Sequence, residues 1–207
     1  MVGRLRFFVP AALAAAALAA PAANAGLIGD VLGGSCPSGG TQVFAPWADA
    51  AYYYLAPNGS FELGTYGWSL SGAGVVPGNE PFYATGTHSL SLPSGSSAVS
   101  PSVCLGPSQL YVRAFAEDAG GSDSGLRIRV RWYGLLNQLL GVTDYDVLQP
   151  GSAWAPTSKI SSAGGLAVPL LPIVGSTTAR VEFTPLGAGS RWNVDDLYID
   201  PWVSRVG

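Results

Sequence analysis

Short stretches in which apolar and polar residues alternate run along most of the chain and predict β-strands. The clearest stretch covers residues 126–133, and its apolar members Leu126, Ile128, Val130 and Trp132 occupy every second position. Successive side chains of a strand point to opposite faces, so these four are expected in a core. The opposite face of the same strand would carry three arginines and a tyrosine, namely Arg127, Arg129, Arg131 and Tyr133.

The remaining strands are predicted from similar patterns between clusters of Gly, Pro, Ser, Asn and Asp. Residues 109–116 are expected to form a hairpin with 126–133, and residues 179–184 a second hairpin with 192–199. Shorter strands are expected at 60–63, 68–71, 88–92, 97–100 and 142–148. No convincing amphipathic helix follows the N-terminus. About ten short antiparallel strands predict an all-β protein, an antiparallel β-sandwich of the jelly-roll type.

The N-terminal 25 residues have the three parts of a cleavable secretory signal peptide. Arg4 and Arg6 precede an apolar run over residues 5–20, and Ala23-Asn24-Ala25 matches the cleavage site. A membrane anchor is the alternative, but the run is shorter than the roughly 20 residues that a span requires. We therefore expect a secreted protein, extracellular or in the cell envelope, with no membrane span after the signal is removed.

Composition and charge restrict the chemistry. Charged residues make up 11% of the 207 residues, against a typical value of about 25%. One His and two Cys exclude the common zinc sites, and no phosphate-binding loop or serine-nucleophile motif occurs. Loss of Arg4 and Arg6 would change the net charge from −3 to about −5, which argues against nucleic-acid binding. These features predict a protein without enzymatic activity.

The two cysteines, Cys36 and Cys104, are expected to form a disulfide because an exported protein meets an oxidising environment. Closing so long a loop would stabilise the fold by about 3–4 kcal/mol. A redox thiol is the alternative, and it lacks the C-x-x-C spacing. We therefore interpret residues 26–56 as an N-terminal extension that is tied to the sandwich through Cys36.

Three motifs in the rest of the chain resemble those of one family. Asn58-Gly59-Ser60-Phe61-Glu62 followed by Gly67-Trp68 resembles the "N-G-x-F-E … G-W" signature of CenC-type carbohydrate-binding modules. The segments 86–92 and 192–199 are similar to that family's "G-x-x-S-L-x-L" and "W-x-V-D-D-V-x-V" strands. The motifs occur in the family's order. The resemblance implies a galactose-binding-like jelly-roll domain over residues 57–202.

The resemblance also implies a structural calcium ion that joins the first and last strands. Its ligands would be Glu62, one of Asp195 and Asp196, and main-chain carbonyls around Thr87 and His88. Calcium prefers six to eight oxygen ligands, which suits this set. Asp195 and Asp196 are adjacent, so at most one side chain is expected to face the ion. Ordinary hydrogen bonds of turn and strand-end residues are the alternative.

A glycan-binding surface would need aromatic rings and planar polar groups, which stack on sugar rings and hydrogen-bond to hydroxyls. The arginine-bearing face of residues 126–133 is the best candidate, joined by Tyr111 and Arg113. Loop contributors could be Tyr83, Tyr145 and Trp154. A solvated sheet face is the alternative interpretation.

The leading hypothesis is therefore non-catalytic binding of a polysaccharide or cell-surface glycan. A structural or adhesive surface protein that keeps the frame without a sugar site is the second. A small glycan-active enzyme is a remote third, because no spacing selects a carboxylate pair and His88 lacks a nucleophile motif.

Overall fold

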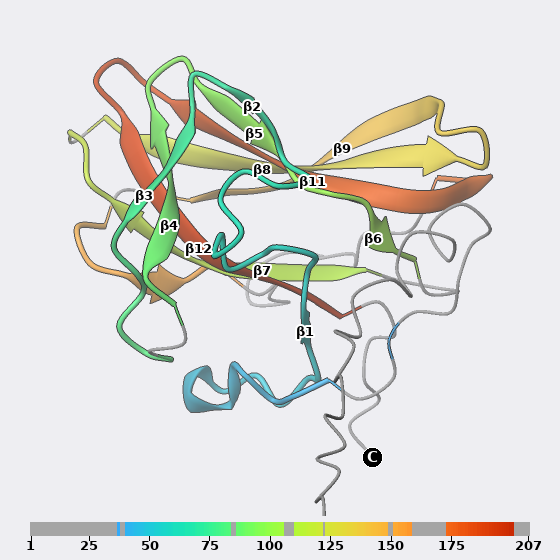
Figure 1. Cartoon of the computed structure of the whole chain (residues 1–207), viewed down its shortest axis with the longest axis horizontal. Helices are drawn as coiled ribbons and strands as arrows, with labels where there is room; N and C mark the ends of the chain where they lie inside the picture. Colours follow the sequence, from blue (N-terminus) through green and yellow to red (C-terminus); the bar gives the residue numbers. More distant parts are fainter. Residues whose placement is uncertain are drawn as a thin grey trace, which may run out of the picture.

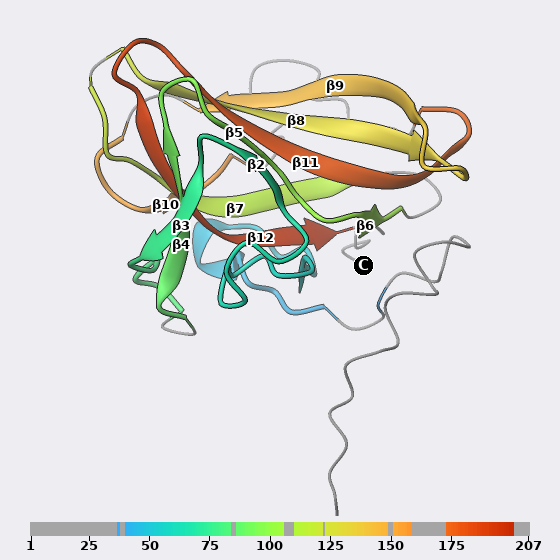
Figure 2. The ribbon, with the colours of Figure 1, turned by 45° about the horizontal axis from the view of Figure 1, so that its top comes forward.

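The computed structural model describes residues 37, 40–83, 86–105, 110–121, 123–148, 151–158 and 173–200. Two antiparallel sheets face each other, so the predicted all-β sandwich of the jelly-roll type is confirmed (Figures 1 and 2). Among these residues the only helix is a 3-10 turn, η1 (Ala45–Trp47). No helix in the described part of the chain is long and apolar enough to cross a membrane. The predicted signal peptide lies outside the described residues.

The first sheet has the strand order β10-β7-β12-β4-β3, with β1 paired to β12. Its members are β1 (Tyr54–Leu55), β3 (Gly74–Pro77), β4 (His88–Pro93), β7 (Tyr111–Asp118), β10 (Ala155–Pro156) and β12 (Arg191–Asp200). The second sheet has the order β2-β5-β11-β8-β9, with β6 paired to β11. Its members are β2 (Ser69–Ser71), β5 (Ser97–Val99), β6 (Val103–Cys104), β8 (Gly125–Gly134), β9 (Leu139–Leu148) and β11 (Ser176–Leu186).

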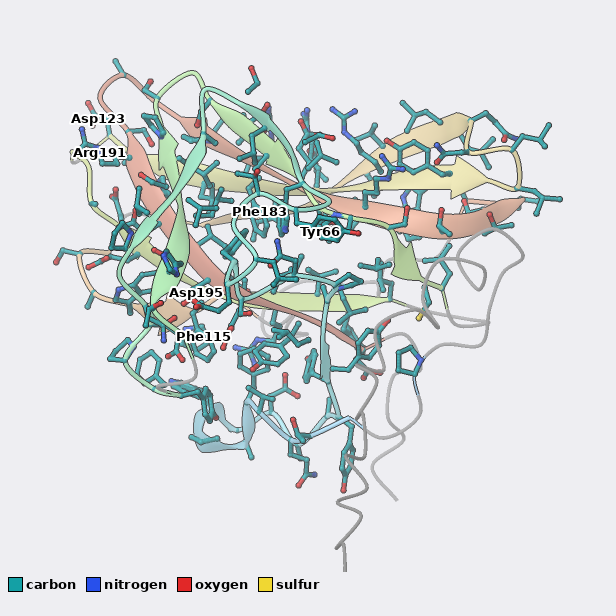
Figure 3. All side chains as sticks on the ribbon, viewed as in Figure 1. Tyr66, Phe115, Asp123, Phe183, Arg191 and Asp195 are labelled. Carbon is teal, nitrogen blue, oxygen red and sulfur yellow. The ribbon has the colours of Figure 1, made fainter. Side chains whose placement is uncertain are left out.

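The alternation in residues 126–133 places its apolar side chains in the core, as predicted. In β8 the apolar residues are buried between the sheets, and Trp132 is fully buried with its indole N–H donating to Thr143 Oγ1 at 2.8 Å. Phe183 of β11 joins the same core (Figure 3). Burying an aromatic side chain of this size typically contributes 1.5–3 kcal/mol relative to exposure. The core therefore fixes which face of β8 points outward.

Both predicted hairpins are wrong. β7 and β8 belong to different sheets, and so do β11 and β12. β8 pairs instead with β11 and β9, whereas β7 pairs with β12 and β10. In a sandwich, consecutive strands can bury their apolar faces by facing each other across the core as well as by pairing side by side. Alternation within a strand does not distinguish the two arrangements.

The predicted strand over residues 60–63 is also wrong, because this segment forms turns. Asn58 and Phe61 have left-handed φ values of 49° and 59°, which a strand does not accommodate. The Asn58 side chain holds the turns together by donating to the carbonyls of Gly64 and Tyr66, each at 2.9 Å. Phe61 is fully buried in the core, so the turn is anchored by its aromatic ring.

The N-terminal segment from Thr41 to Leu55 packs against the outer face of the first sheet. β1 pairs with β12, and a bridge joins Thr41 to Tyr53. A second apolar cluster forms there around Phe44, Tyr53 and Phe115. Figure 3 labels Phe115 beside this segment. This part of the predicted extension is therefore integrated into the fold. Cys36 lies outside the described residues, so the Cys36–Cys104 disulfide stays a prediction.

Candidate functional site

The outer face of the second sheet carries a concentration of charged side chains. We call it the arginine face and define it by its outward-pointing members on β8, β9 and β11. The strand register places Arg131 opposite Arg180 of β11, and Arg129 between Asp144 of β9 and Glu182 of β11. Its charged and aromatic members are Arg127, Arg129, Arg131, Tyr133, Asp144, Arg180 and Glu182.

Two ion pairs connect the three strands of this face. Arg129 Nε donates to Asp144 Oδ1 at 2.5 Å, and Arg131 Nε donates to Glu182 Oε2 at 2.8 Å. The hydrogen bond to Glu182 raises the pKa of the Arg131 guanidinium above its ordinary value. Each pair uses Nε, which is one of the five N–H donors that a guanidinium carries. The pairs therefore fix the orientation of both guanidinium groups through Nε. Each group also carries N–H donors on its two terminal nitrogens.

Tyr133 lies beneath a third arginine. The Arg180 guanidinium carbon is 4.7 Å from the centre of the Tyr133 ring, a cation–π distance. Arg180 also donates to Ser102 Oγ and to Asn137 Oδ1, each at 3.3 Å. Arg127 Nε is buried and has no hydrogen-bond partner among the residues that the structure describes. One face of the Tyr133 ring is thus occupied by Arg180.

The predicted membership of Tyr111 and Arg113 in this face is wrong, because both lie on β7 in the other sheet. Arg113 is 5% exposed, and its guanidinium pairs with Asp49 at 2.9 Å and donates to the Thr157 carbonyl. It holds the N-terminal segment against the first sheet. Tyr83 and Trp154 pack in the aromatic cluster on the same side. The side chain of Tyr145 lies outside the described residues.

The motif residues Glu62, Thr87 and His88 do come together. Glu62 Oε1 accepts the backbone N–H groups of Thr87 and His88 at 2.7 and 2.8 Å, and Oε2 lies 3.3 Å from His88 Nδ1. The amide hydrogen bond from Thr87 lowers the pKa of Glu62 below its ordinary value, as donors to a carboxylate do. The contact is made through amide N–H groups, whereas the resemblance implied carbonyl oxygens.

Asp195 and Asp196 are both buried, and they do not alternate as adjacent strand residues would. A β-bulge interrupts the pairing of β12 with β7 between Asp195 and Tyr198, and Asp196 has a left-handed φ of 47°. Asp195 Oδ2 accepts the amide of buried Glu80 at 3.2 Å, and Asp196 Oδ2 accepts the Tyr198 hydroxyl at 3.3 Å. Which of the two carboxylates would face an ion stays a prediction. Desolvation raises the pKa of Asp195 to about 8 and that of Asp196 to about 6. Figure 3 marks the position of Asp195.

Glu80 is the member of this acidic cluster that the sequence did not single out, because it lies in a loop after β3 and belongs to no motif. Its own amide donates to Asp195 Oδ2 at 3.2 Å. Its carboxylate accepts the amides of Phe82 and Tyr83 at 2.5 and 2.8 Å. No basic side chain within the described residues pairs with Glu80, Asp195 or Asp196.

The cluster has the charge and the oxygen donors that suit a hard cation, but it is not arranged as a complete site. Within the described residues no group of three or more His, Cys, Asp or Glu side chains is placed to hold a metal ion. Glu62 oxygens are turned toward amide donors, and the Thr87 carbonyl accepts the amide of Gly78 at 2.9 Å. Calcium therefore stays a prediction that rests on the family resemblance and on the desolvated charge of Asp195 and Asp196.

No protein-family model matches the sequence, and no curated protein matches it. Several solved structures share the fold. The enzymatically active domain of tailspike protein 4 from bacteriophage CBA120 has a TM-score of 0.52 at 12% identity, over 70% of this chain and 21% of that chain. The arabinose-bound α-L-arabinofuranosidase MgGH51 has a TM-score of 0.50 at 16% identity, over 72% and 26%. The C-terminal family 22 carbohydrate-binding module of Clostridium thermocellum Xyn10B has a TM-score of 0.49 at 14% identity, over 75% and 97%.

The chain thus spans about a fifth to a quarter of the length of the tailspike domain and the arabinofuranosidase. At 12% and 16% identity the likeness to these two proteins concerns the fold alone, and it does not single out the CenC type. The comparisons place this chain among proteins that contain a jelly-roll β-sandwich.

Proposed function

We propose that this chain is an exported, non-catalytic module that binds a polysaccharide or cell-surface glycan on the arginine face. The observation that carries the proposal is the pair of cross-strand ion pairs, Arg129–Asp144 and Arg131–Glu182, at 2.5 and 2.8 Å on an outward sheet face. The side chains of Arg129 and Arg131 are 29% and 32% exposed, so both are accessible from solvent.

The chemistry of this face suits sugar hydroxyls. A guanidinium that already donates Nε to a carboxylate is fixed in orientation, so less side-chain freedom is lost when its terminal N–H groups donate to a ligand. Asp144 is 66% exposed and offers acceptor oxygens beside these donors. Arg127 lies on the same strand, and its Nε has no hydrogen-bond partner among the described residues. Donors and acceptors that alternate across the sheet match the pattern of hydroxyls along a sugar chain.

A structural or adhesive role without a sugar site is the second candidate. This role is favoured because the polar groups of the arginine face already contact one another. Arg129 and Arg131 are ion-paired, and Arg180 covers one side of the Tyr133 ring. Under this alternative the charges keep a long sheet soluble and discourage pairing with other chains.

The calcium ion implied by the resemblance would be structural in either case. We propose that Asp195, Asp196 and Glu62 would supply its carboxylates, with carbonyls near Thr87 and His88. Such an ion would neutralise the desolvated acids and connect β12 to the loop that holds Glu62. A chelator would then lower the melting temperature by several degrees, and an unchanged melting curve would argue against the ion.

Affinity gel electrophoresis tests the glycan proposal. The protein is run through native gels that contain xylan, galactan, arabinan or β-glucan, beside a gel without polysaccharide. We expect retardation in at least one gel, reduced by at least tenfold in affinity for the Arg129→Ala variant. Arg191→Ala removes the same charge from the start of β12 in the first sheet and is expected to migrate like the wild type. Unretarded migration in every gel would favour the structural alternative.

A further inference from the structure

The turn between β8 and β9 exposes an unusual amount of aliphatic surface. Leu135 and Leu136 are 60% and 86% exposed in the turn, and Leu139 is 50% exposed at the start of β9. Val174, two residues before β11, is 97% exposed. We call this region the apolar tip and define it by the exposed aliphatic residues Leu135, Leu136, Leu139, Leu140 and Val174.

These residues belong to one end of the sandwich. The β8–β9 turn lies at one end of the second sheet in both ribbon views, and the start of β11 lies beside it at the same end (Figures 1 and 2). Ile173 packs directly on the backbone of Gly141, and a Cβ on Gly175 would lie 3.8 Å from Leu140 Cδ1. The segment from Ile173 to Gly175 therefore extends the surface formed by the hairpin.

The apolar tip carries no charge. Residues 134–143 contain no Asp, Glu, Lys or Arg, and neither do residues 173–179. Exposed aliphatic side chains gathered at one place of a protein surface often mark an interaction site. Charged residues, which usually protect an exposed hairpin, are absent from residues 134–143 and begin again only at Asp144.

Three backbone amides of the turn make hydrogen bonds within it. The amide of Gly134 donates to the Gln138 carbonyl at 3.0 Å, and the amide of Asn137 donates to the Gly134 carbonyl at 2.9 Å. The amide of Leu136 donates to the Gln138 side chain at 3.0 Å. In a hydrocarbon environment an unpaired amide costs several kcal/mol, so these three bonds lower the cost of moving the turn out of water.

Immediately behind the tip lie a tyrosine and an arginine. Arg180 reaches Asn137 of the turn and stacks over Tyr133, and it forms no ion pair within the part of the chain that the structure describes. Aromatic rings and arginine side chains with an apolar stem and a charged end favour the headgroup region of a bilayer. An unpaired arginine there is attracted by anionic lipids.

We propose that the apolar tip inserts into the surface of a phospholipid bilayer that contains anionic lipids. The leucines of the turn would enter the acyl boundary, about 5–10 Å below the headgroups, while Arg180 and Tyr133 meet the headgroups. A second copy of the chain is the less favoured occupant, because the tip consists only of one turn, the start of β9 and Val174, which offer little of the roughly 800 Å² per partner that a stable interface needs. The insertion does not depend on glycan binding.

Vesicle co-sedimentation tests this assignment. The full exported chain is mixed with vesicles of phosphatidylcholine, or of phosphatidylcholine and phosphatidylglycerol, and the bound fraction is measured against lipid concentration. We expect binding to both, stronger to the anionic vesicles. The double variant Leu135→Ser/Leu136→Ser should lower the partition coefficient at least tenfold, since one buried leucine alone is worth about that factor. Leu63→Ser, which alters another leucine that is 68% exposed, should bind like the wild type.

The variant Arg180→Gln isolates the electrostatic contribution to vesicle binding. This variant should keep the affinity for neutral vesicles and lose most of the preference for anionic ones. Unchanged melting temperatures for the tip variant establish that it is folded. Wild-type protein that stays in the supernatant with both vesicles would overturn the proposal, as would a tip variant that binds normally. A dimer that dissociates in the tip variant, without any vesicle binding, would assign the tip to self-association instead.

Discussion

Removing the carboxylate of Asp49 should destabilise the fold more than any other single change to an ion pair described above. Asp49 is 1% exposed and its partner Arg113 is 5% exposed, with 2.9 Å between Oδ2 and Nη1. The Asp49 carboxylate also accepts the Tyr53 hydroxyl at 2.8 Å and the Ala51 amide at 3.2 Å. Asp49→Ala would therefore leave a buried guanidinium without its counter-charge.

The expected cost is about 3–5 kcal/mol, the usual penalty for breaking a buried ion pair. In a domain of this size one kcal/mol shifts the melting temperature by about 2–4 °C, so a fall of roughly 10 °C is expected. The comparison is Asp144→Ala, which breaks the Arg129 pair where the Asp144 side chain is 66% exposed. Exposed pairs contribute about 0–1 kcal/mol, so this variant should melt within a few degrees of the wild type.

Urea denaturation monitored by tryptophan fluorescence measures both free energies of unfolding. The double variant Asp49→Leu/Arg113→Met should recover much of the loss, because an apolar pair leaves no unpaired charge. The reasoning is refuted if Asp49→Ala unfolds within 1 kcal/mol of the wild type. That result would mean that the segment from Thr41 to Leu55 does not depend on this contact for its packing.

Three further predictions concern stability. Asp195 has a pKa of about 8 in the fold against an ordinary 3.8, so the folded state binds the carboxyl proton more tightly than the unfolded state. The stability that this proton contributes is complete below about pH 4 and is lost as the pH rises through 8. In the presence of chelator, Asp195→Asn should therefore raise the free energy of unfolding at pH 8 relative to the wild type. Equal free energies in urea titrations at pH 8 would count against the burial of this carboxylate. Trp132→Ala should cost about 3–5 kcal/mol by opening a cavity in the core, checked by thermal melting; a loss under 1 kcal/mol would place Trp132 at the surface. Intact mass measured without reduction should show the exported protein two hydrogens lighter than its reduced form, whereas two alkylatable thiols would exclude the Cys36–Cys104 disulfide.

The sequence predicted the class of fold because alternation in residues 126–133 and turn-forming clusters are local signals. It placed Trp132 in the core and the β8 arginines outside for the same reason. It could not predict the pairing of β8 with β11, because that pairing depends on contacts between segments far apart in the chain. The hairpin predictions were wrong on this account.

The candidate site was predicted in part for similar reasons. Arg127, Arg129 and Arg131 share one strand, so their common face followed from period-2 alternation. Arg113 was misplaced because its strand joined the other sheet, where a buried aspartate pairs with it. The contact of Glu80 with Asp195 could not be predicted, because the two residues are far apart in the chain and Glu80 lies in a loop. The carboxylate partners of the β8 arginines likewise depend on strand register and could not be identified in advance.

The central claim is that the arginine face binds glycan, and arginine side-chain NMR tests it most directly. Nε–Hε resonances are recorded while the protein is titrated with the oligosaccharide of whichever polysaccharide retards it. The account predicts saturable shifts for Arg129, Arg131 and Arg127, and an unmoved resonance for Arg191 on the first sheet. Saturable binding that leaves the three β8 resonances unmoved would contradict it.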